Sequence, residues 1–451
     1  MSRQSAGFYQ RLTAFMREDE GVAMALVVAV AGIMFILLTA LVTVTVQQGV
    51  EGSKRYQRAQ VLDVADAGVS AYMRELQRYW FFYESTPTIS GTAGDGTWTV
   101  TASPPAPRDA TIKLSVAASI PSLGVTRHIV AYVKPPSFAD YAVIIDNPGQ
   151  NYSIGSDATF NGKVHANGSV DNAGTCNGTV SAVTAITGSG DFNGTPAKIV
   201  PAPQIDFTTV TSDLQAIKDS AIANNAYFGD AGSYATGKNY MGYKVDLNGT
   251  QYTVTKIRTW STASNATASN VWSLETTTAV TRTIPDSGTV FFDTEPIWIA
   301  GTYSKALTIG VSSQNSAGSN TAPSGASAVY TWNSLRPTDP TDTRQVLGIV
   351  APGDISVPAW FPASPTSYTV QAALLSQTGS IHGDDATSSL HARIDLIGSR
   401  AFKTQGGFSN AFAVRNYTYD DRFAVCVPPM FPRPVVYGGS ALVVTSWNDS
   451  P

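Results

Sequence analysis

The sequence predicts an α+β fold that is mostly β: a long N-terminal transmembrane and amphipathic helix, a small antiparallel sheet, then a β-solenoid-like domain with a helix-hairpin insertion. Three observations predict it. An uncharged apolar run covers Val22 to Val46, short Thr- and Val-rich strands follow, and strands of two to four residues then alternate with Asn-Gly turns. The expected units are a leader (1–21), a helix (22–85, apolar over 22–46 and amphipathic over 47–85), a sheet (86–136), a first solenoid block (137–200), an α/β insertion (201–295) and a second solenoid block (296–451).

The apolar run is long enough to cross a bilayer. A helix rises about 1.5 Å per residue and the hydrocarbon core is about 30 Å thick, so residues 22–46 span it. A cleaved secretory signal has a shorter apolar region and a small-residue cleavage site, which Val44–Gln48 does not offer. A plain anchor fits the length. A third interpretation, cleavage on the cytoplasmic side after Gly21, fits the position of this glycine where the charged leader meets the apolar run.

Beyond the run, apolar residues recur at steps of three and four, which is typical of one face of a helix. No proline interrupts the chain before Pro87, so one helix is predicted from about Val22 to about Tyr83. Its first half is apolar all round, and its second half has one face to pack on a folded domain. The residues of that face are Val61, Ala65, Val69, Tyr72, Leu76 and Tyr79.

Two segments of this helix, Gly21–Val30 and Ala59–Val69, resemble the N-terminus of PilX-type minor pilins of type IV pili. The resemblance implies processing by a prepilin peptidase between Gly21 and Val22. Two departures stand out: Glu20 replaces the usual basic residue before the glycine, and Leu26 stands where major pilins carry a glutamate, an absence shared by minor subunits at filament tips. Small residues permit close approach of neighbouring helices. The expected helix-packing positions are Ala25, Leu26, Ala29, Gly32 and Ala40.

The resemblance implies a structural subunit that is not an enzyme. Its partners would be other pilin subunits, the pilus assembly machinery, the prepilin peptidase and the membrane. We expect the chain to cross the inner (cytoplasmic) membrane once, with its C-terminal domain exported, and to reach a pilus or the cell surface on assembly. The bulk of the β-rich region favours a place at the filament tip, in initiation and adhesion.

The composition argues against several other classes of function. Charged residues make up 14% of the chain, below the ~25% of an average domain, and the net charge of −4 leaves no basic footprint for nucleic acid. Four histidines suggest neither a metal centre nor a cofactor site, so none is expected. Cys176 and Cys426 are compatible with one long-range disulfide in an oxidising compartment or with two buried thiols.

The segments 97–101, 111–116 and 128–133 alternate as strands and predict the small antiparallel sheet, whose apolar partner is the upper helix. Short rungs at 158–170, 176–180 and 191–194 predict the first solenoid block. Longer apolar strands from about residue 296 predict the second block. Because the periodicity is irregular, a β-sandwich is the alternative. Within the insertion, the pattern predicts a helix over 207–222 and a hairpin around Asn248-Gly249.

A second functional hypothesis is a membrane-anchored extracellular β-helix enzyme acting on polysaccharide, which requires clustered carboxylates. The candidates are Asp384-Asp385 beside His382 and Asp420-Asp421 beside Arg422. Adjacent strand residues point to opposite faces, so we expect a solvated loop for the first pair and an ion pair or turn for the second. His165 is expected to be a turn residue donating to a backbone carbonyl. A third hypothesis is an uncleaved surface protein without a filament role.

Overall fold

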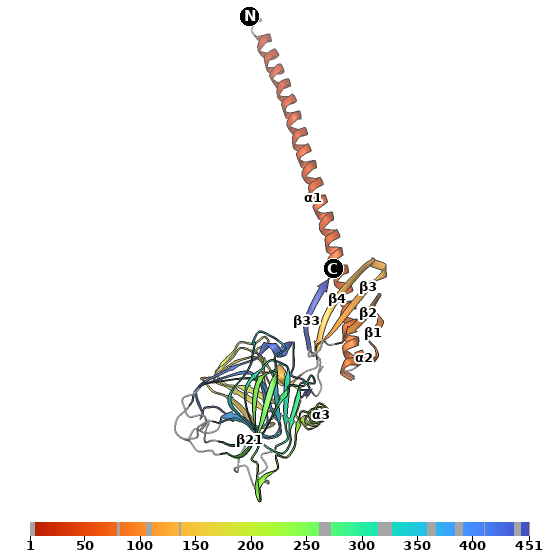
Figure 1. Ribbon diagram of the computed structural model, residues 1–451. Helices are drawn as coiled ribbons and strands as arrows, with labels where there is room; N and C mark the ends of the chain where they lie inside the picture. The colour runs from red at the N-terminus through yellow and green to blue at the C-terminus, as the bar shows by residue number, and fades with distance from the viewer. Residues whose placement is uncertain are drawn as a thin grey trace.

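The computed structural model describes residues 5–78, 82–104, 111–134, 137–260, 272–313, 327–358, 367–383, 391–409, 411–436 and 443–450. It confirms the predicted class: a long apolar helix, a small antiparallel sheet and a large, mainly parallel β-domain. Figure 1 shows the helix projecting as a single rod, with the small sheet along its C-terminal end and the β-domain farthest from the N-terminus.

Helix α1 runs without a break from Ser5 to Arg78 and is followed by the short α2 (Phe82–Ser85). It begins well before the expected Val22 because the leader contains no proline to stop it. The predicted apolar face is confirmed where it is described: Val61, Ala65, Val69, Tyr72 and Leu76 are buried in one core with the small sheet. Tyr79, the last residue predicted for this face, lies outside the described residues.

The small sheet has five antiparallel strands in the order β1-β2-β3-β4-β33. Alternating apolar residues of β2 and β3, such as Trp98, Val100, Leu114 and Val116, face α1. The fifth strand differs from the sequence interpretation, which placed the whole C-terminus in the second solenoid block. It pairs with β4, whose outer edge is otherwise unpaired. The strands are β1 (Thr88–Ala93), β2 (Gly96–Ser103), β3 (Ile112–Ile120), β4 (Val125–Lys134) and β33 (Val443–Ser450).

The β-domain is therefore an insertion between two neighbouring strands of the small sheet. The chain leaves the sheet at Lys134 and re-enters it at Val443, and these two residues are partners in the β4–β33 register. Both connections lie at one end of the sheet, so the insertion leaves the helix–sheet unit intact.

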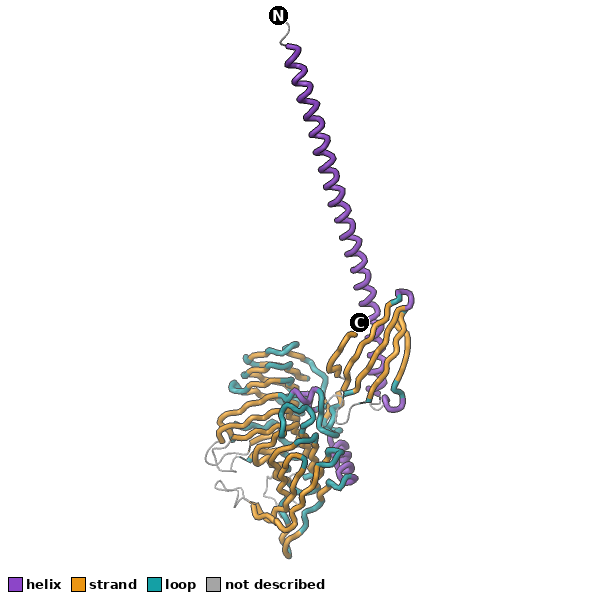
Figure 2. The backbone as a smooth tube through the Cα atoms, turned by 45° about the horizontal axis from the view of Figure 1, so that its top comes forward, coloured by secondary structure: helices purple, strands orange, loops and turns teal. Residues whose placement is uncertain are grey.

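The first block of the β-domain stacks short parallel rungs, as predicted. Phe160, Cys176 and Phe192 lie in register on successive rungs, each 16 residues after the last. Figure 2 shows short strands stacked one above another in the β-domain, and the pairings of β7, β10 and β13 are parallel. The strands are β5 (Val143–Ile145), β6 (Asn151–Ile154), β7 (Thr159–Asn161), β8 (Val164–Ala166), β9 (Ser169–Asn172), β10 (Thr175–Cys176), β11 (Val180–Ala182), β12 (Ala185–Thr187), β13 (Asp191–Phe192) and β14 (Lys198–Ile199).

The second block continues the same parallel ladders rather than forming a sandwich. Ala401 in β30 pairs with Ile144 in β5, and Tyr417 in β31 pairs with Phe160 in β7, so the last rungs of this block stack on the first rungs of the other. The strands are β22 (Thr289–Phe292), β23 (Ile297–Tyr303), β24 (Leu307–Val311), β25 (Val329–Pro337), β26 (Leu347–Ala351), β27 (Ile355–Val357), β28 (Ser367–Ser376), β29 (Ile381–Gly383), β30 (His391–Phe402) and β31 (Phe412–Thr418).

The segment between the blocks contains the predicted helix, α3 (Val210–Ala223), and the predicted hairpin, β19 (Tyr243–Gly249) with β20 (Gln251–Trp260). It is not a separate unit, because β19 pairs in parallel with β23 and extends the solenoid at its far end. The remaining elements are β15 (Ile205–Asp206), β16 (Tyr227–Phe228), β17 (Ser233–Ala235), β18 (Lys238–Asn239), β21 (Trp272–Thr283), β32 (Val435–Val436) and the 3₁₀ turns η1 (Pro121–Leu123), η2 (Phe138–Asp140) and η3 (Asp421–Ala424).

Candidate functional site

The apolar half of α1 is exposed on every side. Leu26 is 65% and Phe35 is 74% exposed, and α1 is the helix in the described chain that is long and apolar enough to cross a membrane. The hydroxyls of three threonines in this half are hydrogen-bonded within the helix. The Oγ1 of Thr43 donates to the backbone carbonyl of Thr39 at 2.8 Å, and Thr39 and Thr45 each donate in the same way to the carbonyl four residues earlier. This half of the helix therefore suits an apolar environment.

The predicted processing and packing residues all lie on this rod. Gly21, Val22 and Ala25 are in the continuous helix. Ala29 and Ala40 are exposed, and a Cβ built on Gly32 meets no atom within 4 Å. The surface is thus open to a close-packed neighbour, while cleavage after Gly21 and helix packing stay predictions.

A second feature is a polar groove along the first solenoid block. Three successive rungs each contribute an Asn-Gly pair, and they line a cavity of about 700 Å³. The Nδ2 of Asn177 donates to the Oδ1 of Asn161 at 2.6 Å, and the Nδ2 of Asn193 donates to the Oδ1 of Asn177 at 3.0 Å. The three amides form a continuous ladder along the solenoid axis.

The glycines beside this ladder are required by the stacking. A Cβ on Gly178 would lie 2.1 Å from the carbonyl oxygen of Gly162, and one on Gly194 would lie 2.4 Å from the carbonyl carbon of Gly178. Sequence reasoning treated the periodicity as irregular and missed this site. The signal that predicts it is the 16-residue recurrence of Asn-Gly after an apolar residue.

The lining continues onto the rung that stacks on β7, where Thr418 of β31 is the register partner of Asn161. Thr418 is the last residue of β31, Tyr419 follows it, and Asp421 belongs to η3. Lys134 also lines the cavity, but its ammonium is paired with Asp140 and is buried.

His165 differs from its expected role. It lies within β8 rather than in a turn, and its ring bonds to side chains: Nδ1 is 2.9 Å from the Ser181 hydroxyl and Nε2 is 3.1 Å from the Asn167 Oδ1. Burial lowers the pKa of His165 to about 4, so the ring is neutral. The correction arises because residue 165 lies within a buried strand, beside Ser181 of the next rung and Asn167, rather than in the turn.

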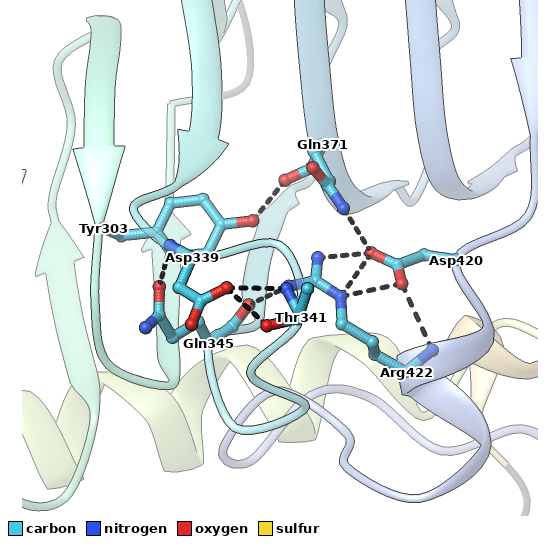
Figure 3. Close-up of polar contacts among 7 residues, drawn as sticks. All are labelled: Tyr303, Asp339, Thr341, Gln345, Gln371, Asp420 and Arg422. Carbon is cyan, nitrogen blue, oxygen red and sulfur yellow. Dashed lines mark hydrogen bonds and ion pairs between the residues drawn. The ribbon is translucent and has the colours of Figure 1, made fainter.

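The predicted ion pair at Asp420 and Arg422 is confirmed. The Arg422 Nη2 lies 2.5 Å from the Asp420 Oδ2, both side chains are buried, and Arg422 also donates to the Gln345 carbonyl at 2.8 Å (Figure 3). The side-chain amide of Gln371 donates to the Asp420 carboxylate at 3.1 Å. The backbone carbonyl of Gln371 accepts a hydrogen bond from the Tyr303 hydroxyl at 2.6 Å. These contacts fasten the segment before β26 to η3, which is a structural role.

Of the remaining candidates, the structure describes His382, Cys176 and Cys426. Asp384 and Asp385 lie outside the described residues; neighbouring His382 bonds to the Ser380 hydroxyl at 2.7 Å. Cys176 and Cys426 are both buried thiols, and burial raises the pKa of Cys176 to about 11. Among the described residues, no group of three or more His, Cys, Asp or Glu side chains could hold a metal ion.

The fold defines a class: a helix-anchored protein whose small sheet carries an inserted β-solenoid. No protein-family model matches the sequence, and no curated protein matches it. Among solved structures, the competence-associated pilin ComZ from Thermus thermophilus is similar at a TM-score of 0.35 and 12% identity, over 87% of this chain and 97% of that chain. That similarity is too weak to carry an argument, so the function is argued from the geometry.

Proposed function

We propose that the chain is a non-enzymatic, pilin-like structural subunit. Residues 22–46 hold it in a membrane before assembly and then pack among the helices of a filament. One observation carries the proposal: a single unbroken helix, α1, is exposed and apolar in its first half and packs on an antiparallel sheet in its second half.

Exposed apolar surface of this extent is costly in water, at about 25 cal/mol per Å². A bilayer and a bundle of apolar helices both remove that cost, and a subunit that moves between them needs a surface suited to each. Ala29, Gly32 and Ala40 permit close helix approach in the bundle. Gly21, at the start of the apolar run, supports cleavage there by a prepilin peptidase.

Two features support a place at the filament tip. Leu26 brings no carboxylate to neutralise the amino terminus of a neighbouring subunit, so this chain fits poorly as a repeating unit. The solenoid is bulky and lies beyond the sheet, on the side away from the N-terminus (Figure 1). A solenoid in this position would not clash with the filament body and would be accessible for initiation or adhesion contacts. The ion pairing of Asp420 with Arg422 supports a non-enzymatic head.

The test is the intact mass of the N-terminal peptide of the native protein, recovered from membranes and from sheared filaments. The expected chain begins at Val22 and carries an N-methyl group. A chain from both fractions that still begins at the leader would overturn the proposal. Gly21→Asp should block cleavage and filament entry, whereas Gly32→Ala, a matched glycine change in the same helix, should leave processing as in the parent.

A further inference from the structure

The Asn-Gly groove has hydrogen-bonding capacity that the protein does not use. Each asparagine amide offers two N–H donors and a carbonyl acceptor. The ladder engages one donor of Asn177 and one of Asn193, and all three asparagine side chains are exposed to the groove. The same three rungs add the side chains of Lys163, Thr179 and Thr195.

From this arrangement we propose that the groove binds an extended, neutral, β-1,4-linked polysaccharide chain running along the solenoid axis. This binding would be a property of the β-domain alone and goes beyond the filament role, because the groove does not involve α1.

The periodicity of the groove favours a periodic ligand. Successive rungs of a parallel sheet lie about 4.8 Å apart. One sugar residue of an extended β-1,4 chain advances by a similar length, and successive residues are turned by about 180°, so the amides of alternate rungs, Asn161 and Asn193, meet equivalent positions of the chain. An amide N–H and carbonyl side by side match a pair of neighbouring sugar hydroxyls, since a hydroxyl both donates and accepts.

The charges favour a neutral ligand over a polyanion. The groove lining exposes one lysine, Lys163, and one aspartate, Asp421, whereas Lys134 and Asp140 neutralise each other. A phosphate backbone is held by several cations, and among the described residues the lining exposes only Lys163. Tyr419, half-buried just after β31, adds an aromatic side chain to the lining.

The same lining favours holding a chain rather than cutting it. Glycoside hydrolysis normally uses two carboxyl groups about 5–9.5 Å apart on either side of the scissile bond. The carboxylates lining this cavity are Asp140 and Asp421, and Asp140 is engaged by Lys134 and by the backbone N–H of Ser137. A cavity of about 700 Å³ is within the usual range for ligand sites.

The experiment is titration calorimetry of the full chain in a detergent without a sugar headgroup, using cellohexaose and N-acetylchitohexaose as probes. Saturable binding of at least one is expected. Asn177→Ala should weaken it by about tenfold through lost hydrogen bonds, and Thr195→Trp should abolish it by filling the groove. Asn151→Ala, an exposed asparagine in β6 outside the cavity lining, should bind as the parent does.

Circular dichroism of each variant establishes that it is folded. Failure of both hexasaccharides to bind the folded parent would overturn the inference, as would unchanged affinity in both groove variants. Binding of an oligonucleotide that weakens with salt, without any glycan signal, would replace it with a nucleic-acid site. Because the measurement uses unassembled protein, it succeeds or fails independently of the N-terminal processing test.

Discussion

The ammonium of Lys134, the last residue of β4, donates a 2.7 Å hydrogen bond to the carbonyl oxygen of Phe423 in η3. The same ammonium pairs with Asp140 in η2, and Lys134 is only 2% exposed. One buried side chain thus connects the end of the small sheet to η2, which precedes the first rung of the solenoid, and to η3, which follows β31.

Lys134→Met is expected to destabilise the protein by about 3–5 kcal/mol, because it leaves the Asp140 carboxylate with little access to water and without its cation. Urea unfolding of detergent-solubilised protein, followed by tryptophan fluorescence, measures this. Lys305→Met is the matched control: its partner Asp286 is almost fully exposed, and the change should cost at most about 1 kcal/mol. Equal costs for the two variants would show that Lys134 does not hold the junction.

Gly178→Ala tests whether the rungs need glycine. The new Cβ would meet the Gly162 carbonyl oxygen at 2.1 Å, and a backbone atom in a stacked rung cannot move aside alone, so we expect a loss of about 3 kcal/mol or more. Gly407→Ala, whose Cβ would meet only a side chain at 3.9 Å, should change stability by less than about 0.5 kcal/mol. Thermal unfolding compares the two, and a neutral Gly178→Ala would contradict the stacking argument.

Several elements of the fold could be predicted from residues that are close together in the sequence. The apolar face at Val61, Ala65 and Val69 and the hairpin at Asn248-Gly249 depend on residues close in sequence, and the structure confirms them. Periodicity and turn chemistry are local properties, so a single sequence reveals them.

Long-range pairing was not accessible in the same way. Two strand pairings join segments that are far apart in the chain: Lys134 with Val443, and Ala401 with Ile144. The sequence of each strand does not specify which other strand it pairs with. The insertion of the solenoid between β4 and β33, and the stacking of its last rungs on its first, therefore emerge only in three dimensions. The groove depends on a 16-residue recurrence that was present in the sequence and not recognised.

Tyr72→Phe addresses the packing of α1 on the sheet. The Tyr72 hydroxyl donates to the Thr86 carbonyl at 2.8 Å and the ring is fully buried, so losing the hydroxyl should cost about 1 kcal/mol. Tyr72→Ala also loses the ring and should cost about 3–5 kcal/mol. Tyr56→Phe, at an exposed position of the same helix, is the control and should be neutral in the same urea assay. A Tyr72→Ala variant as stable as the parent would show that the helix and sheet are not coupled there.

His165 gives the protein a specific acid sensitivity. Burial lowers its pKa from 6.5 to about 4, so the unfolded chain binds a proton that the native state does not over this interval. The free energy of unfolding must then fall as pH falls from about 6.5 to about 4, and the contribution is complete above that window. His165→Gln removes the titration of this ring, so the free energy of unfolding of the variant should vary less with pH over this interval than that of the parent. Unfolding free energies measured across the interval decide the matter: identical slopes for His165→Gln and the parent would mean that the ring is protonated in the folded solenoid as readily as in the unfolded chain.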